Sequence, residues 1–306
     1  MPRLSHTGAA RPAQVSAAQL LRNGSRGLAR AKLHYGHGTV SPSDDAAALL
    51  AHALGLRRPL APRDLARAVS GRAQRRYTML LQRRIRERRP VVYLTNQCWF
   101  AGVRFHVDER VLIPRSPIAE LIERQFTPWV DPDTVRRIAD LGTGSGCIAL
   151  AAALALPRAR VDAVDISRDA LAVARINRAA LGLSRRVRLL EGDFFSRLAG
   201  RRYDIIVSNP PYVGTAEYGG LPPEYRHEPA GALRSGHDGM AAVRRLLTQA
   251  AGHLTEAGVL IVEVGNTETR VRRAFPRLPF VWLSFARGGG GVFLLTAAQL
   301  RAAGLR

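Results

Sequence analysis

The stretch that decides the fold is Ile138-Ala139-Asp140-Leu141-Gly142-Thr143-Gly144-Ser145-Gly146-Cys147. It reads as the end of a strand, three alternating glycines and the start of a helix, so the backbone can pass very close to a ligand at the carboxyl edge of the strand. Its GxGxG spacing differs from the GxGxxG that receives a pyrophosphate, and no Gly-Lys-Ser/Thr follows as a P-loop requires. The turn therefore predicts a ligand without a pyrophosphate.

Acidic side chains follow the next two strands. Residues 161–165 form an apolar strand that ends in Asp165, at the place where an acidic side chain accepts hydrogen bonds from ribose hydroxyls. We expect Asp193 to accept from an adenine amino group and Phe194 to lie against the ring, although an acid and an aromatic at a strand end are more often a turn and a core residue. Glycines followed by Asp165 fit a nucleoside, and S-adenosylmethionine is such a ligand.

The fourth strand, residues 204–208, runs straight into Asn209-Pro210-Pro211-Tyr212. The two prolines fix the backbone and leave the carbonyls of the turn free as acceptors. A planar amide or amidine nitrogen placed here donates one hydrogen to the Asn209 side-chain oxygen and the other to the Pro210 carbonyl, with its face on Tyr212. This arrangement predicts a methyl transfer that is catalysed mainly by positioning and electrostatic complementarity.

From about residue 134 the chain alternates strands and helices. Strands separated by helices of ten or more residues predict a parallel, doubly wound sheet. The segments before it, 15–33, 41–54 and 71–89, have helical apolar spacing, interrupted in the first at Gly24 and Gly27 and ended in the last by Pro90. The expected divisions are a basic tail over 1–12, a helical substrate-recognition domain over 13–92, a hairpin and linker over 93–133 and the α/β domain over 134–306.

Composition excludes several classes of protein. The 306 residues are 46% apolar, which is enough for about two domains with a sizeable core, and no apolar run approaches the roughly 20 residues of a membrane span. The two cysteines form neither a disulfide framework nor a CxxC site, and His34 and His37 lack a Cys or carboxylate at metal-ligand spacing. We therefore expect a cytoplasmic protein without a metal.

The formal net charge is +22, and residues 1–90 hold +14 of it. Polyanions are the first partners to consider for such a chain. Ribosomal RNA or a ribosome-assembly intermediate, bound through the basic N-terminal domain, is the expected partner. The alternative is a solvated basic surface with no partner, since Lys32 is the only lysine and the arginines can reflect coding bias.

The glycine turn 140–146 together with 209–212 resembles the N5-glutamine methyltransferases, relatives of the N6-adenine enzymes that share the Asn-Pro-Pro-Tyr turn. Residues 112–117, Leu-Ile-Pro-Arg-Ser-Pro, resemble the segment ahead of the core in the glutamine enzymes. The Arg-Ser-Pro variant, with similar matches at 35–39, 93–96 and 224–229, is typical of the branch that methylates a glutamine of the third large-subunit ribosomal protein. The basic extension 1–12 and the arginine density of the N-terminal domain go beyond what can be carried over from this resemblance.

The resemblance implies a Rossmann-like seven-stranded methyltransferase domain, preceded by a small helical domain and a β-hairpin linker, that uses S-adenosylmethionine. The expected cofactor-binding residues are Asp140, Gly142, Thr143, Gly144, Gly146, Asp165, Asp193, Phe194, Asn209 and Arg115. The expected substrate-binding residues are Asn209, Pro210, Pro211 and Tyr212, of which Asn209, Pro210 and Tyr212 are the catalytic ones. A release-factor glutamine methyltransferase, an N6-adenine methyltransferase and a non-catalytic assembly factor are the alternatives.

Overall fold

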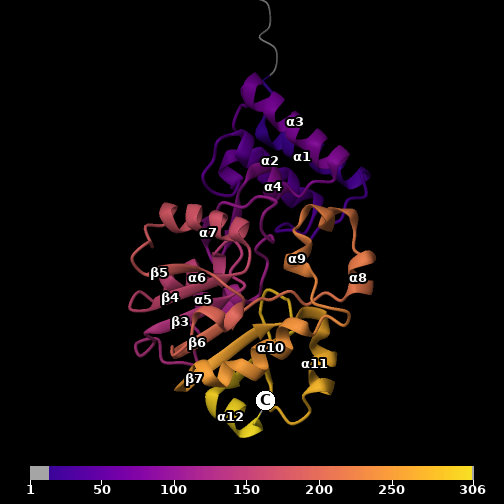
Figure 1. The fold of residues 1–306 in the computed structure, drawn as a ribbon. Coiled ribbons are helices and arrows are strands. Elements are labelled where there is room, and N and C mark those ends of the chain that lie inside the picture. The colour runs from indigo at the N-terminus through magenta and orange to yellow at the C-terminus, as the bar shows by residue number, and fades with distance from the viewer. Residues whose placement is uncertain (1–13, 305–306) are drawn as a thin grey trace, which may run out of the picture. The chain divides into compact units, whose positions relative to one another are not determined.

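The computed structural model describes residues 14–304, which form two compact units. The N-terminal unit runs to Tyr35 and resumes at Thr39–Thr95, and the sheet unit comprises Gly36–Gly38 and the chain from Asn96 onward (Figure 1). The hairpin and linker expected as a separate segment over 93–133 thus fall mostly within the sheet unit. The tail expected over 1–12 lies outside the described residues.

Four α-helices build the N-terminal unit: α1 (Ala17–Arg30), α2 (Pro42–Ala53), α3 (Gly71–Glu87) and α4 (Val91–Thr95). Serine side chains cap the first three by accepting a backbone N–H of the first turn. The sequence did not predict α4, because Pro90 was taken only as the residue that ends the helix over 71–89. In the structure Arg88 ends α3 with a left-handed backbone, and Pro90, which has no N–H to satisfy, precedes the new helix.

Helix α1 also runs without a break through Gly24 and Gly27, where the sequence predicted an interruption. The reason is packing at Gly24, where a Cβ atom would lie 2.0 Å from the Tyr77 hydroxyl oxygen. The Tyr77 hydroxyl donates to the Leu20 carbonyl at 3.2 Å, so α3 packs directly on the backbone of α1. Gly24 permits this close contact between the two helices, and the packing outweighs the low helix propensity of glycine.

The sheet unit opens with the predicted hairpin, in which β1 (Cys98–Phe100) pairs antiparallel with β2 (Val103–Phe105). Helix α5 (Ile118–Glu123) then precedes a seven-stranded sheet with the order β5-β4-β3-β6-β7-β9-β8. Its strands are β3 (Arg137–Leu141), β4 (Arg160–Asp165), β5 (Val187–Glu191), β6 (Tyr203–Ser208), β7 (Leu254–Glu263), β8 (Val281–Trp282) and β9 (Val292–Thr296). The pairs from β5 to β7 are parallel and the last two are antiparallel, which confirms the predicted seven-stranded, Rossmann-like fold.

Alternate residues along the strands face opposite layers. Ile138 of β3 packs with α5 and α6 (Cys147–Ala155), whereas its neighbour Ala139 packs with α10 (Ala241–Ala250) and α12 (Ala297–Ala303). Helices on both faces leave only the strand ends open to ligands. In open sheets of this kind, ligands bind in the crevice outside the carboxyl ends of the strands.

The elements that the sequence did not predict are short. They include α8 (Thr215–Gly219), α9 (Ala230–Leu233), α11 (Glu268–Ala274) and α12. The strand–helix alternation does predict helices over 169–181 and 239–253, which the structure shows as α7 (Arg168–Ala180) and α10. Helices of four to seven residues carry too few apolar positions for a periodic signal. Among residues 14–304, no helix is long and apolar enough to cross a bilayer.

Candidate active site

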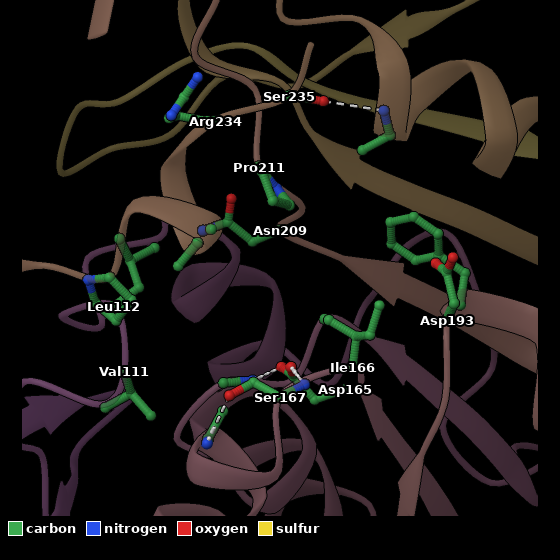
Figure 2. A pocket seen from close by; sticks show the side chains of 18 of the residues that line it. Val111, Leu112, Asp165, Ile166, Ser167, Asp193, Asn209, Pro211, Arg234 and Ser235 are labelled. Carbon is green, nitrogen blue, oxygen red and sulfur yellow. Dashed lines mark hydrogen bonds between the residues drawn. The ribbon is translucent and has the colours of Figure 1, made fainter. Parts of the chain in front are cut away.

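A cavity of about 440 Å³ lies at the carboxyl ends of the central strands. Gly142 and Gly144 after β3, Asp165 after β4, Asp193 after β5 and Asn209 after β6 all line it. Figure 2 shows the side chains grouped around this space, with Asp165 and Ser167 on one wall and Asn209 and Pro211 on another. The structure therefore brings together predicted residues from four successive strands.

The glycine turn is shaped by its backbone. Gly142, Gly144 and Gly146 have φ angles of +75°, +57° and +79°, a region that residues with a Cβ atom rarely adopt. Asp140, fully buried, accepts from the Thr143 hydroxyl at 2.6 Å and from the Ala149 N–H at 3.0 Å. Asp140, Thr143 and Gly146 thus hold the turn from behind and do not line the cavity.

Burial raises the pKa of Asp140 to about 7. Its second carboxylate oxygen, Oδ1, is buried without a hydrogen-bond partner among the described residues. A buried acceptor without a donor carries a desolvation cost. Asp140 is therefore both the anchor of the turn and an acceptor that is not fully satisfied.

Asp165 is held in place by the same turn. Its Oδ2 accepts from the Gly144 N–H and its Oδ1 from the Ser167 N–H, each at 2.8 Å. Burial raises its pKa, and these two backbone donors oppose the rise. Each carboxylate oxygen keeps a further lone pair, so Asp165 can still accept from hydroxyl groups of a ligand in the cavity.

Asp193 and Phe194 both lie in the cavity wall, and Figure 2 labels the Asp193 side chain there. Asp193 is engaged by Arg245, whose guanidinium donates to its Oδ2 at 2.7 Å. The Arg245 guanidinium carbon also lies 5.3 Å from the centre of the Phe194 ring. Sequence reasoning missed Arg245, because it lies on α10, about fifty positions along the chain, and only the fold brings it here.

The turn after β6 leaves its polar side chain free. Asn209 Oδ1 is buried and has no hydrogen-bond partner among the described residues. Before it, the Ser208 hydroxyl donates to the Leu141 carbonyl at 2.6 Å and ties β6 to β3. Pro211 lines the cavity beside Asn209, while Pro210 is buried behind it.

Tyr212, also behind the cavity wall, is held by a buried carboxylate. Its hydroxyl donates to Glu263 Oε1 at 3.3 Å, and the Ser116 hydroxyl donates to the other oxygen of Glu263. Burial raises the pKa of both Tyr212 and Glu263. Glu263, the last residue of β7, is thus a site residue that the sequence analysis did not identify, and the apolar strand around it gave no signal.

Arg115, expected among the cofactor-binding residues, does not line the cavity. Its guanidinium donates to Glu228 at 2.7 Å and lies 5.5 Å from the centre of the Tyr225 ring. Glu228 is buried and is also 3.1 Å from His37 Nε2. Burial acts to raise the pKa of Glu228, but hydrogen bonds from His37 and Arg115 outweigh it and lower that pKa. Arg115 thus joins distant segments of the sheet unit.

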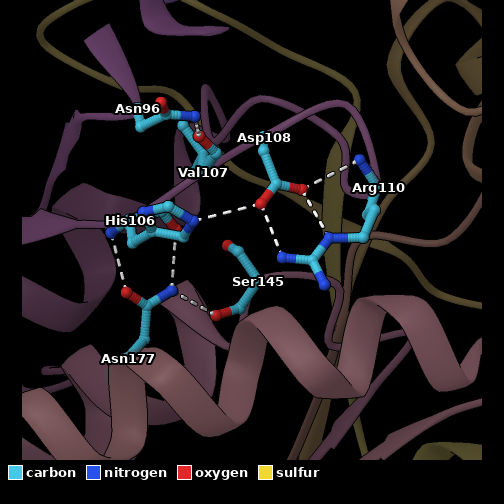
Figure 3. Close-up of polar contacts among 7 residues, drawn as sticks. All are labelled: Asn96, His106, Val107, Asp108, Arg110, Ser145 and Asn177. Carbon is cyan, nitrogen blue, oxygen red and sulfur yellow. Dashed lines mark hydrogen bonds and ion pairs between the residues drawn. The ribbon is translucent and has the colours of Figure 1, made fainter.

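A second set of residues that the sequence missed follows the hairpin. Arg110, Val111 and Leu112 line the cavity. Arg110 donates to Asp108 through two nitrogens, at 2.8 and 2.7 Å, and Asp108 also contacts His106 (Figure 3). A buried side chain of the sheet unit binds the start of this segment.

That side chain is Asn177 of α7. Its amide oxygen accepts from the His106 N–H at 2.7 Å, and its amide nitrogen donates to the carbonyls of His106 and Ser145, both at 2.9 Å (Figure 3). Because Ser145 belongs to the glycine turn, Asn177 couples that turn to the segment that carries Arg110. No local pattern distinguishes such an asparagine in a helix.

The site contains no ligand set for a metal. Within residues 14–304, no group of three or more His, Cys, Asp or Glu side chains is arranged to hold a metal ion. The acidic groups at the cavity are instead paired with backbone N–H groups or arginine, as described above.

Comparisons with known proteins agree with this geometry. Residues 17–95 match the PrmC N-terminal domain model and residues 124–219 the Methyltransferase small domain model. Ribosomal protein uL3 glutamine methyltransferases from Bordetella pertussis and Burkholderia pseudomallei are 47% and 44% identical over 92% of this chain and 95% of their own length. The solved catalytic domain of hMettl16 is 15% identical over 72% of this chain and 80% of its own, with a TM-score of 0.50, and shares the fold.

Proposed function

The chain belongs to the family of ribosomal protein uL3 glutamine methyltransferases, and we propose that the cavity described above is where it methylates a glutamine of uL3. The methyl group passes from S-adenosylmethionine to the side-chain amide nitrogen. The observation that carries this assignment is the buried, unpartnered Oδ1 of Asn209 in the wall of the cavity.

The residues present fit the cofactor. A volume of about 440 Å³ lies in the usual range of small-molecule sites, about 300–1,000 Å³. Gly144 lets the backbone approach a ligand closely, and Asp165 offers lone pairs to the ribose hydroxyls. Ile166 and Phe194 supply apolar surface in the same wall. When bound, S-adenosylmethionine supplies a methyl group on a positively charged sulfur.

Asn209, fixed by the two prolines that follow it, holds the nucleophile. The side-chain NH₂ of glutamine is a donor, and the Asn209 oxygen, which is in the wall of the cavity, accepts one of its hydrogens. Because a buried acceptor without a donor is costly, the arrangement favours a substrate with an N–H over one without. Tyr212, fixed through Glu263, supports the turn that carries Asn209 from behind the cavity wall.

Positioning is the main contribution to catalysis. An amide nitrogen is a poor nucleophile since its lone pair is delocalised, and it becomes positively charged as the methyl group arrives. The Asn209 oxygen stabilises that charge where it develops, and the proton then passes to solvent. The carboxylates near the turn already have partners among the described residues: Glu263 accepts hydrogen bonds from Ser116 and Tyr212, and Asp193 accepts from Arg245.

The partner is uL3 in the cytoplasm, before or during assembly of the large subunit. The N-terminal unit carries a large share of the net charge of +22 and docks this substrate together with ribosomal RNA or an assembly intermediate. Release factor and an adenine base remain the competing substrates, because the Asn-Pro-Pro-Tyr turn also suits their planar amide and amino groups.

A parallel labelling assay separates the substrates. Purified uL3, release factor and DNA are incubated with the enzyme and methyl-labelled S-adenosylmethionine, and the modified residue is located by mass spectrometry. We expect one methyl group on a glutamine of uL3. Label in release factor or DNA alone contradicts the assignment.

A further inference from the structure

A second cavity, of about 530 Å³, opens at the amino ends of the strands that form the active site at their other ends. Arg137 and Arg160 begin β3 and β4, and Tyr203 begins β6. In β4 five residue steps of about 3.3 Å separate Arg160 from Asp165, so the two cavities lie on opposite edges of the sheet, roughly 17 Å apart along the strand. The second cavity is therefore separate from the methyl-transfer site.

Its lining is strongly cationic. Of the described residues that line it, seven are arginines and Asp162 is the only acidic one, so this lining has a formal charge of +6. Asp162 is already shared: it accepts from Arg188 at 2.8 Å, from Arg201 at 2.9 Å and from the Tyr203 hydroxyl at 2.7 Å. One carboxylate cannot neutralise the remaining guanidinium groups.

Two further arginines form the wall. Arg178 donates to the Val187 carbonyl at 3.1 Å, and Arg186 donates to the carbonyl of Ala153. Carbonyl acceptors orient a guanidinium without cancelling its charge. Both side chains are half-buried, so the wall of the cavity is a fixed cationic surface.

Three arginines remain available to a ligand. The side chains of Arg137, Arg160 and Arg185 are exposed, and among the described residues none of them makes a side-chain hydrogen bond or ion pair. Guanidinium groups bind phosphate oxygens through two parallel hydrogen bonds and are less strongly hydrated than ammonium groups. The cavity thus combines wall arginines that are held by protein carbonyls with exposed arginines that are free to bind a ligand. This arrangement is expected for recognition of a phosphate backbone.

We propose that this cavity binds the phosphodiester backbone of RNA while the opposite edge of the sheet methylates its protein substrate. Both the size of the cavity and the number of arginines exceed what a single phosphate needs, which favours a chain of phosphates. The identity of the RNA as ribosomal rests on the proposed function. The cavity lies in the sheet unit, so this contact is additional to the docking proposed for the N-terminal unit.

The test compares two triple variants of the full chain. Arg137→Gln/Arg160→Gln/Arg185→Gln removes the free arginines of the cavity, and Arg124→Gln/Arg273→Gln/Arg277→Gln removes three exposed arginines of the sheet unit that do not line it. Binding of a fluorescent RNA hairpin derived from ribosomal RNA is measured by anisotropy at several salt concentrations. Inorganic phosphate is titrated in parallel as a competitor.

We expect the cavity variant to bind RNA at least tenfold more weakly at physiological salt, with the slope of log K against log salt reduced by about two. In the matched variant, both the loss of RNA affinity and the reduction of the salt slope should be clearly smaller. Equal affinity and slope in the two variants would overturn the proposal, and so would a cavity that binds inorganic phosphate but not RNA. Methyl transfer to free uL3, measured on the same samples, reports on the proposed function independently.

Discussion

The two turns that close the cavity, after β3 and after β6, use their polar groups in opposite ways. At the glycine turn, Asp140 accepts hydrogen bonds from Thr143 and Ala149, and Asp165 accepts from Gly144 and Ser167. Most of the hydrogen bonds of these two carboxylates therefore stabilise the shape of the loop. In the second turn Asn209 presents a buried oxygen without a partner. The first turn is therefore suited to holding a cofactor by shape, and the second to holding a reacting group by hydrogen bonding.

The largest expected effect is at the second turn. Asn209→Ala should lower the rate of methyl transfer to uL3 about 10²- to 10³-fold, as for removal of one preorganised polar group at a reacting centre. Affinity for S-adenosylmethionine should change little. Single-turnover kinetics at saturating cofactor measure the rate, and a variant with wild-type turnover would remove Asn209 from the mechanism.

At the first turn the loss should appear in cofactor binding. Asp165→Ala removes a charged acceptor for ribose hydroxyls and should weaken binding by roughly 1.5–3 kcal/mol, or about 10- to 150-fold. Calorimetric titration with S-adenosylmethionine measures this. Asp193→Ala is the matched control, since the Asp193 carboxylate is also in the wall but is already paired with Arg245. This variant should lose less of the free energy of S-adenosylmethionine binding. An unchanged affinity for Asp165→Ala places the ribose elsewhere.

A smaller effect should come from the support of Tyr212. Glu263→Gln replaces an acceptor of two hydroxyl donors with an amide that can accept from only one side. Loss of about one net hydrogen bond predicts a roughly fivefold lower turnover with unchanged cofactor affinity. Glu256→Gln, exposed on the same strand, is the control. Equal turnover of the two variants would mean that Glu263 does not position Tyr212.

The last effect is on folding stability and not on methyl transfer, and it concerns the pH dependence of unfolding. The folded-state pKa of Asp140 is about 7, above its ordinary 3.8, so folding takes up a proton between these values. This contribution to the free energy of unfolding is full at low pH, falls as pH rises from about 4 to 7, and levels off above. Asp140→Asn should flatten that part of the profile in urea denaturation without cofactor. Identical pH profiles for the two proteins would contradict this.

Local patterns in the sequence were enough to predict the sheet and the two turns that line the cavity. The glycines at 142–146 require positive φ, and the prolines at 210 and 211 fix the backbone after β6, so both signals are local. The remaining wall could not be predicted, because Arg245 and Asn177 reach the site only through the packing of α10 and α7. The position of Arg115 could not be predicted for the same reason, since its partner Glu228 lies more than a hundred positions away in the chain.

The most direct test measures two quantities for the pair Asp165→Ala and Asn209→Ala: the dissociation constant of S-adenosylmethionine and the single-turnover rate on uL3 at saturating cofactor. The division of labour between the turns predicts a crossed result, with weakened binding and a retained rate for Asp165→Ala, and retained binding and a lost rate for Asn209→Ala. If both variants lose the same quantity, the two turns do not divide cofactor and substrate between them.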